Sequence, residues 1–388
     1  MLMPTTPEAD FVFNLVRQVG NPDQAEERLR EIAHTDPDWS DVLTLAGGHG
    51  IVPLLNESIS EIEELVPREY AQTVQNRCRS RALKNIRYVE RLHDLNDAFR
   101  ENQIQVIPYK GPVVAEVAYG SISRRWFSDL DFLVIEEDPL DAHGVLQDQG
   151  YKQTEFAGIP PSQLVNGSIF QWEGEFHFLN ERDAIPIDLR HQFVGKYRNG
   201  EGLFSDLWER RTSVSLAGES VPALSPEDRV VLLLAHGTKH GWCRLSWVCD
   251  VALLLQQDVQ WNDIIDRAAQ YGWKTAALLG IAVAAELAEI DVPRSVRRQI
   301  SADPRANIGS AILCALFSAD PTGDRLDLDP LTIILLLNNT PRDSLREAFN
   351  KAVSPWPSDY QWISLPQKLY PLYYLVRPLR ILLHKIKK

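Results

Sequence analysis

Two aspartates separated by one residue are the groups in this sequence best suited to metal chemistry. Asp129 and Asp131 lie in Ser128–Val134, whose apolar residues predict a β-strand. Alternate residues of a strand face the same side, so both carboxylates would point one way. Carboxylates this close raise each other's pKa unless a cation lies between them, and Mg²⁺ is a cation that also brings phosphates with it. The pair indicates a metal–phosphate site; the alternative is a turn at a strand start, capped by Asp129.

Three cations that precede the aspartates are candidates for phosphate contacts. Lys110 follows a short β-branched run and would open a helix from about Pro112 to Tyr119, and Arg124 and Arg125 lie in the loop after it. Lys110 could neutralise a triphosphate or be an exposed turn lysine. The two arginines could clamp phosphate through paired hydrogen bonds, or one of them could form a salt bridge with Asp129.

The spacing of these residues resembles that of a known family. The pattern Lys-Gly, then Tyr, then Arg, then Asp-x-Asp-x-Leu-Val is formed here by Lys110, Gly111, Tyr119, Arg125, Asp129, Asp131, Leu133 and Val134. It resembles the nucleotidyltransferase superfamily with the DNA polymerase β-like fold, and more closely a family of uncharacterised bacterial nucleotidyltransferases. The superfamily has Gly-Ser at the start of its first helix, where Lys110–Gly111 stands here, and a Gly120–Ser121 follows later. The sequence leaves open which pair cradles phosphate.

The resemblance implies two Mg²⁺ ions and three carboxylates. The first two aspartates would bind both ions, and a third on a neighbouring strand would complete one site and take the proton from the attacking hydroxyl. Asp188, in the strand-like run Ala184–His191, stands at the corresponding place. Asp is depleted in strands, which favours a functional role, although a salt bridge with Arg190 or Arg182 is the alternative.

The resemblance also implies an NTP substrate and a pocket for it. The residues expected to contact the nucleotide are Lys110, Gly111, Arg124, Arg125, Ser128 and His240. His236 and His240 lie four apart in an expected helix, a spacing that can bind metal, but no Glu lies between them as a metalloprotease would need. Packing between helices, or a nucleotide or acceptor pocket, are the other readings. Asp250 is expected to be buried and paired, with His240 or Arg244 as candidate partners.

Around these residues the sequence predicts an α+β protein, with a nucleotidyltransferase-type mixed β-sheet between helical regions. Residues 1–100 show helical periodicity, residues 101–215 alternate strand-like and helical runs, and residues 216–388 are helical again and end in a basic tail. We expect a helical N-terminal region, a nucleotidyltransferase-like core and a helical C-terminal domain with these boundaries.

Composition narrows the partners and the compartment. The net charge of −13 argues against long nucleic acid, because a phosphate backbone needs a basic face. The cysteines show no Cys-x-x-Cys spacing: Cys78, Cys243, Cys249 and Cys314. No apolar leader opens the sequence, and no apolar run approaches the ~18 residues of a membrane span. We therefore expect a cytoplasmic protein.

The tail from Tyr360 to Lys388 differs from the rest of the chain. It has no Asp or Glu, and it combines basic residues with Trp, Tyr and Leu. Such a mixture is typical of a helix at a membrane surface, or of a helix docked on an acidic protein. The docked helix is the favoured reading, and membrane binding remains possible.

Together these features predict a Mg²⁺-dependent nucleotidyltransferase. It would move an NMP from an NTP to a small-molecule, peptide or protein acceptor and release pyrophosphate. The alternative is a non-catalytic nucleotide-binding or scaffold protein on the same fold, one form of which would associate with a membrane surface through the tail.

Overall fold

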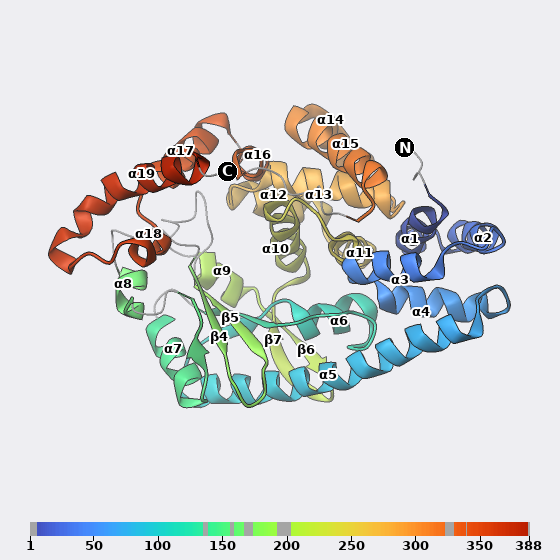
Figure 1. Ribbon diagram of the computed structural model, residues 1–388, viewed down its shortest axis with the longest axis horizontal. Helices are drawn as coiled ribbons and strands as arrows, with labels where there is room; N and C mark the ends of the chain where they lie inside the picture. The colour runs from blue at the N-terminus through green and yellow to red at the C-terminus, as the bar shows by residue number, and fades with distance from the viewer. Residues whose placement is uncertain are drawn as a thin grey trace.

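The structure is a computed structural model that describes residues 6–134, 139–155, 159–166, 174–191, 203–322, 330–338 and 340–386. A mixed sheet lies between a long helix on one side and a mass of C-terminal helices on the other (Figure 1). The α+β class predicted from the sequence, with helical regions before and after the sheet, is confirmed.

The secondary-structure elements of the N-terminal region are all helices among its described residues. Its elements are α1 (Pro7–Arg17), α2 (Pro22–Ala33), α3 (Trp39–Gly48), α4 (Val52–Glu61), the 3₁₀ turn η1 (Glu63–Leu65) and α5 (Arg68–Glu101). Local signals set their starts, because proline stands in the first turn of α1, α2 and α4, and the Asp38 carboxylate accepts from the backbone amides of Ser40 and Asp41. With 34 residues, α5 extends about 50 Å and supports the sheet.

The central sheet has five strands in the order β1-β2-β5-β4-β3. The strands are β1 (Val106–Pro108), β2 (Leu130–Val134), β3 (Lys152–Gln153), β4 (Glu175–Leu179) and β5 (Pro186–Arg190), with helices α6 (Gly111–Tyr119), α7 (Pro139–Asp148) and α8 (Pro161–Asn166) between them. β2 and β5 run parallel, and the other pairs are antiparallel. The parallel pair at the centre places the starts of β2 and β5 side by side.

The two faces of the sheet differ in chemistry. One face is apolar and packs with α5 and α7 in a core that includes Leu95, Phe99, Phe132 and Leu189. Because side chains alternate along a strand, the intervening residues of β2, β4 and β5 point to the opposite face. On that face the three strands carry mostly charged and polar side chains, and this is where the candidate site lies.

The C-terminal part covers the polar face with helices. Its elements are α9 (Leu203–Glu209), β6 (Thr212–Leu216), β7 (Glu219–Ala223), α10 (Pro226–Lys239), α11 (Leu245–Leu255), α12 (Trp261–Gln270), α13 (Lys274–Leu287), α14 (Arg294–Ala302), α15 (Pro304–Ala319), α16 (Pro330–Leu337), α17 (Pro341–Val353), α18 (Pro357–Trp362), η4 (Gln367–Leu372) and α19 (Tyr373–Ile386). Local signals set the start of α10, because Pro226 stands in its first turn and the Ser225 hydroxyl accepts from the amide of Asp228. The hairpin β6–β7 spans residue 216, where the helical region was predicted to begin, and the two boundaries between the three predicted regions stay predictions.

Candidate active site

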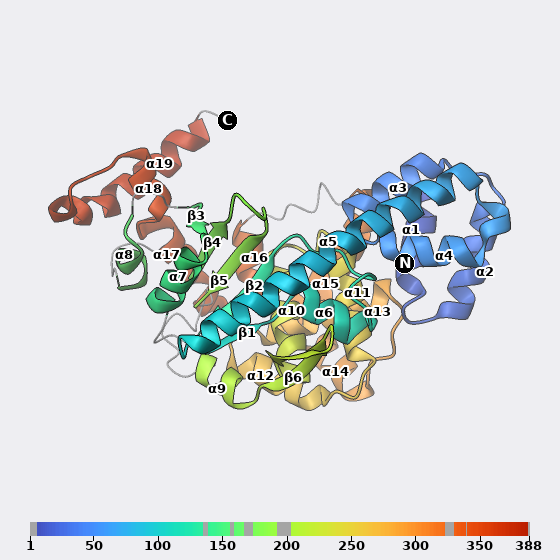
Figure 2. The same cartoon turned by 90° about the horizontal axis from the view of Figure 1, so that it is seen from below.

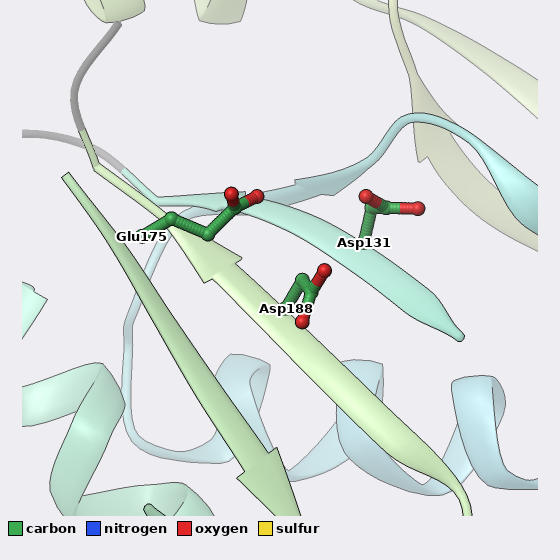
Figure 3. Close-up of side chains that lie close together, drawn as sticks. All are labelled: Asp131, Glu175 and Asp188. Carbon is green, nitrogen blue, oxygen red and sulfur yellow. The ribbon is translucent and has the colours of Figure 1, made fainter. Parts of the chain in front are cut away.

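Asp131 and Asp188 face each other across the central pair of strands. Asp131 on β2 and Asp188 on β5 are register partners, so their side chains emerge on the same face. Glu175, from β4, joins them there. Carboxylate oxygens of all three residues lie within 4.8 Å of one another, a spacing that could hold a metal ion, and Figure 3 shows the side chains rising from one face.

Glu175 and His177 belong to this cluster and were missed from the sequence. Their strand alternates two polar residues with Phe176 and Phe178, which are buried on the apolar face. That alternation was the available signal, because it indicates that the polar residues share the opposite face. Glu175 is opposite Arg190 in the register and its carboxylate forms a buried ion pair with that guanidinium. Burial acts to raise the pKa of Glu175, but the charge of Arg190 outweighs it and holds that pKa below its usual range.

Asp129 lies in the bend before β2 and is half-buried. It is outside the group of oxygens within 4.8 Å, but it remains part of the same charged cluster. Burial, and then the charge of Asp188, raise its pKa. The structure thus brings the three predicted aspartates together near the starts of β2 and β5. Glu175, rather than Asp129, belongs to the tightest group.

A buried lysine forms an ion pair with Asp131. Lys110 Nζ donates to Asp131 Oδ1 at 2.7 Å, and the two side chains are only 13% and 4% exposed. Burial would lower the pKa of Lys110, but the Asp131 carboxylate overrides it and the pKa is raised. Burial and the acidic neighbours raise the pKa of Asp131 to about 7, against the lowering effect of Lys110. The site therefore concentrates more negative charge than one lysine neutralises.

His177 contacts the third aspartate. Its Nδ1 lies 2.7 Å from Asp188 Oδ1. The hydrogen bond to Asp188, opposed by burial, raises the pKa of His177 to about 9, so the imidazolium form donates to the carboxylate. This contact fixes the orientation of the Asp188 side chain.

Lys110–Gly111 and Gly120–Ser121 occupy opposite ends of α6, which decides their distance from the carboxylates. Gly111 begins the helix at a φ of 49°, and a Cβ there would lie 3.2 Å from the carbonyl oxygen of Asp129. Gly120 ends the helix in the left-handed conformation. A nine-residue helix separates the pairs by about 13 Å. Lys110–Gly111 is the pair beside the aspartates.

The two arginines predicted to contact phosphate are both engaged elsewhere. Arg124 forms a two-pronged ion pair with Glu57 of α4, with Nε and Nη2 each 2.6 Å from a carboxylate oxygen. Arg125 is buried, and its Nε and Nη2 donate to Asp250 at 2.8 and 2.7 Å. The Tyr119 hydroxyl also donates to Asp250 at 2.8 Å.

The prediction of the partner of Asp250 was therefore wrong. The residue is buried and paired as predicted, but with Arg125 and Tyr119 instead of His240 or Arg244. These contacts tie the loop before the aspartates to α11. The sequence could not show this, because the partners lie 125 residues apart.

The end of α10 lies against the site. His240 caps the C-terminal end of this helix, and its ring lies tilted against the rings of His236 and Trp247, with ring centroids 4.6 and 5.5 Å away. Burial and the charge of Lys110 hold the pKa of His236 well below its usual value, so the ring is neutral. Within the described ranges the histidines join no metal-capable group. Ser128 is exposed, and its carbonyl accepts from the Tyr88 hydroxyl at 2.9 Å.

The donor set suits a hard divalent cation. Carboxylate oxygens on adjacent strands converge. Burial and neighbouring acids raise the pKa values of Asp129 and Asp131, and a divalent cation would offset this concentration of negative charge. A parallel strand pair with acids at its start, next to a lysine at a helix start, is an arrangement that can bind metal and phosphate together.

Comparison with known proteins places the chain in a family. No curated protein matches it. An antigenic nucleotidyltransferase-like protein from Paracoccidioides brasiliensis is 11% identical with a TM-score of 0.33, over 50% of this chain and 84% of that one. The antibiotic-resistance factor ANT(2'')-Ia is 12% identical with a TM-score of 0.29, over 61% of this chain and 95% of that one. A family described as uncharacterised nucleotidyltransferases matches residues 35–289, and the chain belongs to that family.

Proposed function

We propose that this protein is a metal-dependent nucleotidyltransferase that moves an NMP from an NTP to an acceptor and releases pyrophosphate. The observation that carries the proposal is the convergence of Asp131, Asp188 and Glu175 on one face of the sheet, beside Lys110. Family membership supports the reaction class, because it implies an NTP substrate.

Asp131 and Asp188 are the proposed centre of a Mg²⁺ site, with Asp129 and Glu175 on either side. Two Mg²⁺ ions, when bound, would supply charge stabilisation for the attacking and leaving oxygens of an in-line displacement. The fit rests on oxygen donors, on their spacing within 4.8 Å, and on the pKa of Asp131, which burial and its acidic neighbours raise to about 7. Glu175 extends the predicted set of Asp129, Asp131 and Asp188.

Asp188 is the proposed proton acceptor. The acceptor oxygen would bond to the α-phosphorus while the bond from that phosphorus to the bridging oxygen breaks, and the proton of the acceptor hydroxyl would pass to the Asp188 carboxylate. His177 would position that carboxylate through the 2.7 Å contact. Asp131 is less suited to this step, because its side chain is only 4% exposed, against 20% for Asp188.

Lys110 and Arg81 are the proposed contacts for the triphosphate. Arg81, on α5, is half-buried, and Asp129 is among the charges that act on its pKa. Its Nε has no hydrogen-bond partner in the described part of the chain, and its guanidinium lies 5.8 Å from the ring centre of Trp126. Since Arg124 and Arg125 already bind carboxylates, Arg81 is the arginine near the site that could turn to phosphate.

The acceptor is proposed to be a small molecule, a peptide or a protein. The net charge of −13 disfavours long nucleic acid, and the end of α10 with His236 and His240 is the proposed wall of the nucleotide or acceptor pocket. The neutral, half-buried ring of His236 could pack against a base or an apolar acceptor group.

The proposal is tested by Mg²⁺-dependent turnover of an α-labelled NTP by the full chain. Asp131→Asn and Asp188→Asn keep side-chain shape but remove charge, and each is expected to lower turnover by about 100-fold or more. Glu181→Gln is the matched control, because Glu181 is an exposed acid in the β4–β5 turn that pairs only with Lys152 in the described residues.

The outcomes separate the enzyme from the alternative. Loss of turnover in both variants, with the control unchanged, supports the transferase. Mg²⁺-dependent binding of a non-hydrolysable NTP by isothermal titration, without turnover of any NTP, would instead support a nucleotide-binding protein on the same fold. Equal turnover in all variants would refute the assignment of the site.

A further inference from the structure

The last helix presents its apolar face to solvent. Along α19, the side chains of Leu375, Leu379, Leu382 and Leu383 are 70%, 54%, 62% and 41% exposed. Their spacing of four, three and one residues places them on one side of the helix. A helix on the surface of a soluble protein normally turns this side inward, so the orientation is inverted.

Polar contacts hold the helix in this orientation. Arg380 Nε donates to Asp359 Oδ1 at 2.6 Å, and Arg377 donates to the carbonyl of Lys351 at 3.0 Å. Asp359 is fully buried, and the guanidinium of Arg377 lies 5.6 Å from the Trp356 ring centre. Rotating α19 to cover its leucines would remove these contacts from a buried carboxylate, which is strongly unfavourable. The docked basic helix predicted from the sequence is thus combined with an outward apolar face.

Neighbouring turns extend the same kind of surface. Trp362, Leu369, Leu372 and Tyr374 are each about two-fifths exposed or more. A small core of tyrosines fixes these turns, and the Tyr373 hydroxyl donates to the carbonyl of Ile363 at 2.6 Å. We call Trp362, Leu369, Leu372, Tyr374 and the four α19 leucines the leucine face. It lies at the end of the molecule opposite the N-terminal helices (Figures 1 and 2).

The segment of sequence that carries the leucine face has a positive net charge. No Asp or Glu occurs from residue 360 to the end of the sequence, Lys368 is exposed between α18 and α19, and lysines follow in the sequence at 385, 387 and 388. Two copies of such a surface would bring like charges together. The face is also wider than a two-position coiled-coil seam, because adjacent residues 374 and 375, and 382 and 383, are all exposed.

We propose that the leucine face binds an anionic membrane surface, with α19 lying in the plane of the interface. Leucines would enter the acyl boundary, Trp362 and Tyr374 would lie at headgroup depth, and the exposed Lys368 would meet the acidic headgroups. Within the described ranges, no helix is long and apolar enough to cross a bilayer. This inference is independent of the proposed chemistry.

The test is co-sedimentation of the full chain with vesicles of phosphatidylcholine alone and with about one-third phosphatidylglycerol. The wild-type protein is expected to pellet with the anionic vesicles and less so as salt rises. Leu379→Gln combined with Leu382→Gln should lower the partition coefficient by about tenfold or more. The matched control is Leu83→Gln with Ile86→Gln, two exposed apolar residues on α5, which should bind as wild type does.

Three results would overturn the proposal. The first is a wild-type chain that stays in the supernatant with anionic vesicles. The second is equal pelleting by the leucine-face variant and wild type. The third is a concentration-dependent dimer, measured by analytical ultracentrifugation, that the variant abolishes, since this would assign the face to a second copy of the chain.

Discussion

Removal of the buried lysine gives the sharpest test of how the acidic site is balanced. In Lys110→Met, the carboxylate of Asp131 loses the ammonium that lies 2.7 Å away, and both side chains are nearly inaccessible to water. Removing one partner of a buried pair costs about 3–5 kcal/mol, because the other charge is left uncompensated. At roughly 2 °C for each kcal/mol, Tm should fall by about 6–10 °C in EDTA at pH 8.

The dependence on pH follows from the raised pKa of Asp131, which is about 7 through burial and its acidic neighbours. Between the unfolded pKa near 4 and the folded value, the folded state keeps a proton that the unfolded chain has lost, so stability falls as pH rises. Without Lys110 the folded pKa is higher still, and this fall continues to higher pH. The difference in Tm between wild type and variant should therefore be small near pH 6 and large near pH 8.

The assay is differential scanning fluorimetry in EDTA and in Mg²⁺ at both pH values. Mg²⁺ should raise the Tm of Lys110→Met more than that of wild type, because the cation and the ammonium compete for the same Asp131 oxygen. Lys152→Met is the control, since Lys152 forms an exposed pair with Glu181 and its Tm should not change. Equal Tm values for Lys110→Met and wild type at pH 8 would show that the buried pair does not balance the site.

Three further perturbations examine the surroundings of the site. Arg125→Met should lower the free energy of unfolding, measured by chemical denaturation, by about 3–5 kcal/mol, because the buried Asp250 carboxylate loses its cation partner. The double variant Arg125→Met with Asp250→Leu should recover most of this stability. It should also keep the affinity for NTP if Arg125 contacts no phosphate. Gly111→Ala should cost about 1–2 kcal/mol and weaken turnover, because it combines a φ of 49° with a Cβ 3.2 Å from the Asp129 carbonyl; unchanged turnover would contradict this. Burial, and then the charge of Arg190, lower the pKa of His191 to about 4, so the folded state binds fewer protons than the unfolded chain. The free energy of unfolding should therefore fall by about 3 kcal/mol between pH 6.5 and pH 4. A His191→Asn variant with the same pH profile as wild type would refute this.

The chemistry-bearing strands could be predicted because their signals are local. Asp131 lies in a run whose alternate residues face the same side of a strand, and Asp188 is an acid inside an apolar run. Both residues could therefore be identified without knowledge of the fold. The starts of α1 and α10 also carry local signals, a proline in the first turn and a capping side chain, Thr6 or Ser225.

The composition of the tightest acidic group could not be predicted, because it depends on strand pairing. Glu175 enters the site only because β4 pairs with β5 and places it near Asp131 and Asp188. Nothing within a few residues of Glu175 specifies that pairing. Asp129 has the stronger local motif, yet the bend before β2 keeps it out of the closest set of oxygens.

By itself the sequence determined the class of fold, the family resemblance and the aspartates that lead the candidate site. Hydrophobic periodicity and turn chemistry act over a few residues, and these features need no more than that. Only the tertiary structure shows that Arg125 forms an ion pair with Asp250, that Lys110 forms one with Asp131, and that α19 exposes its leucines to solvent. Each of these depends on which distant segment supplies the partner for a buried charge, and a buried charge without a partner costs several kcal/mol.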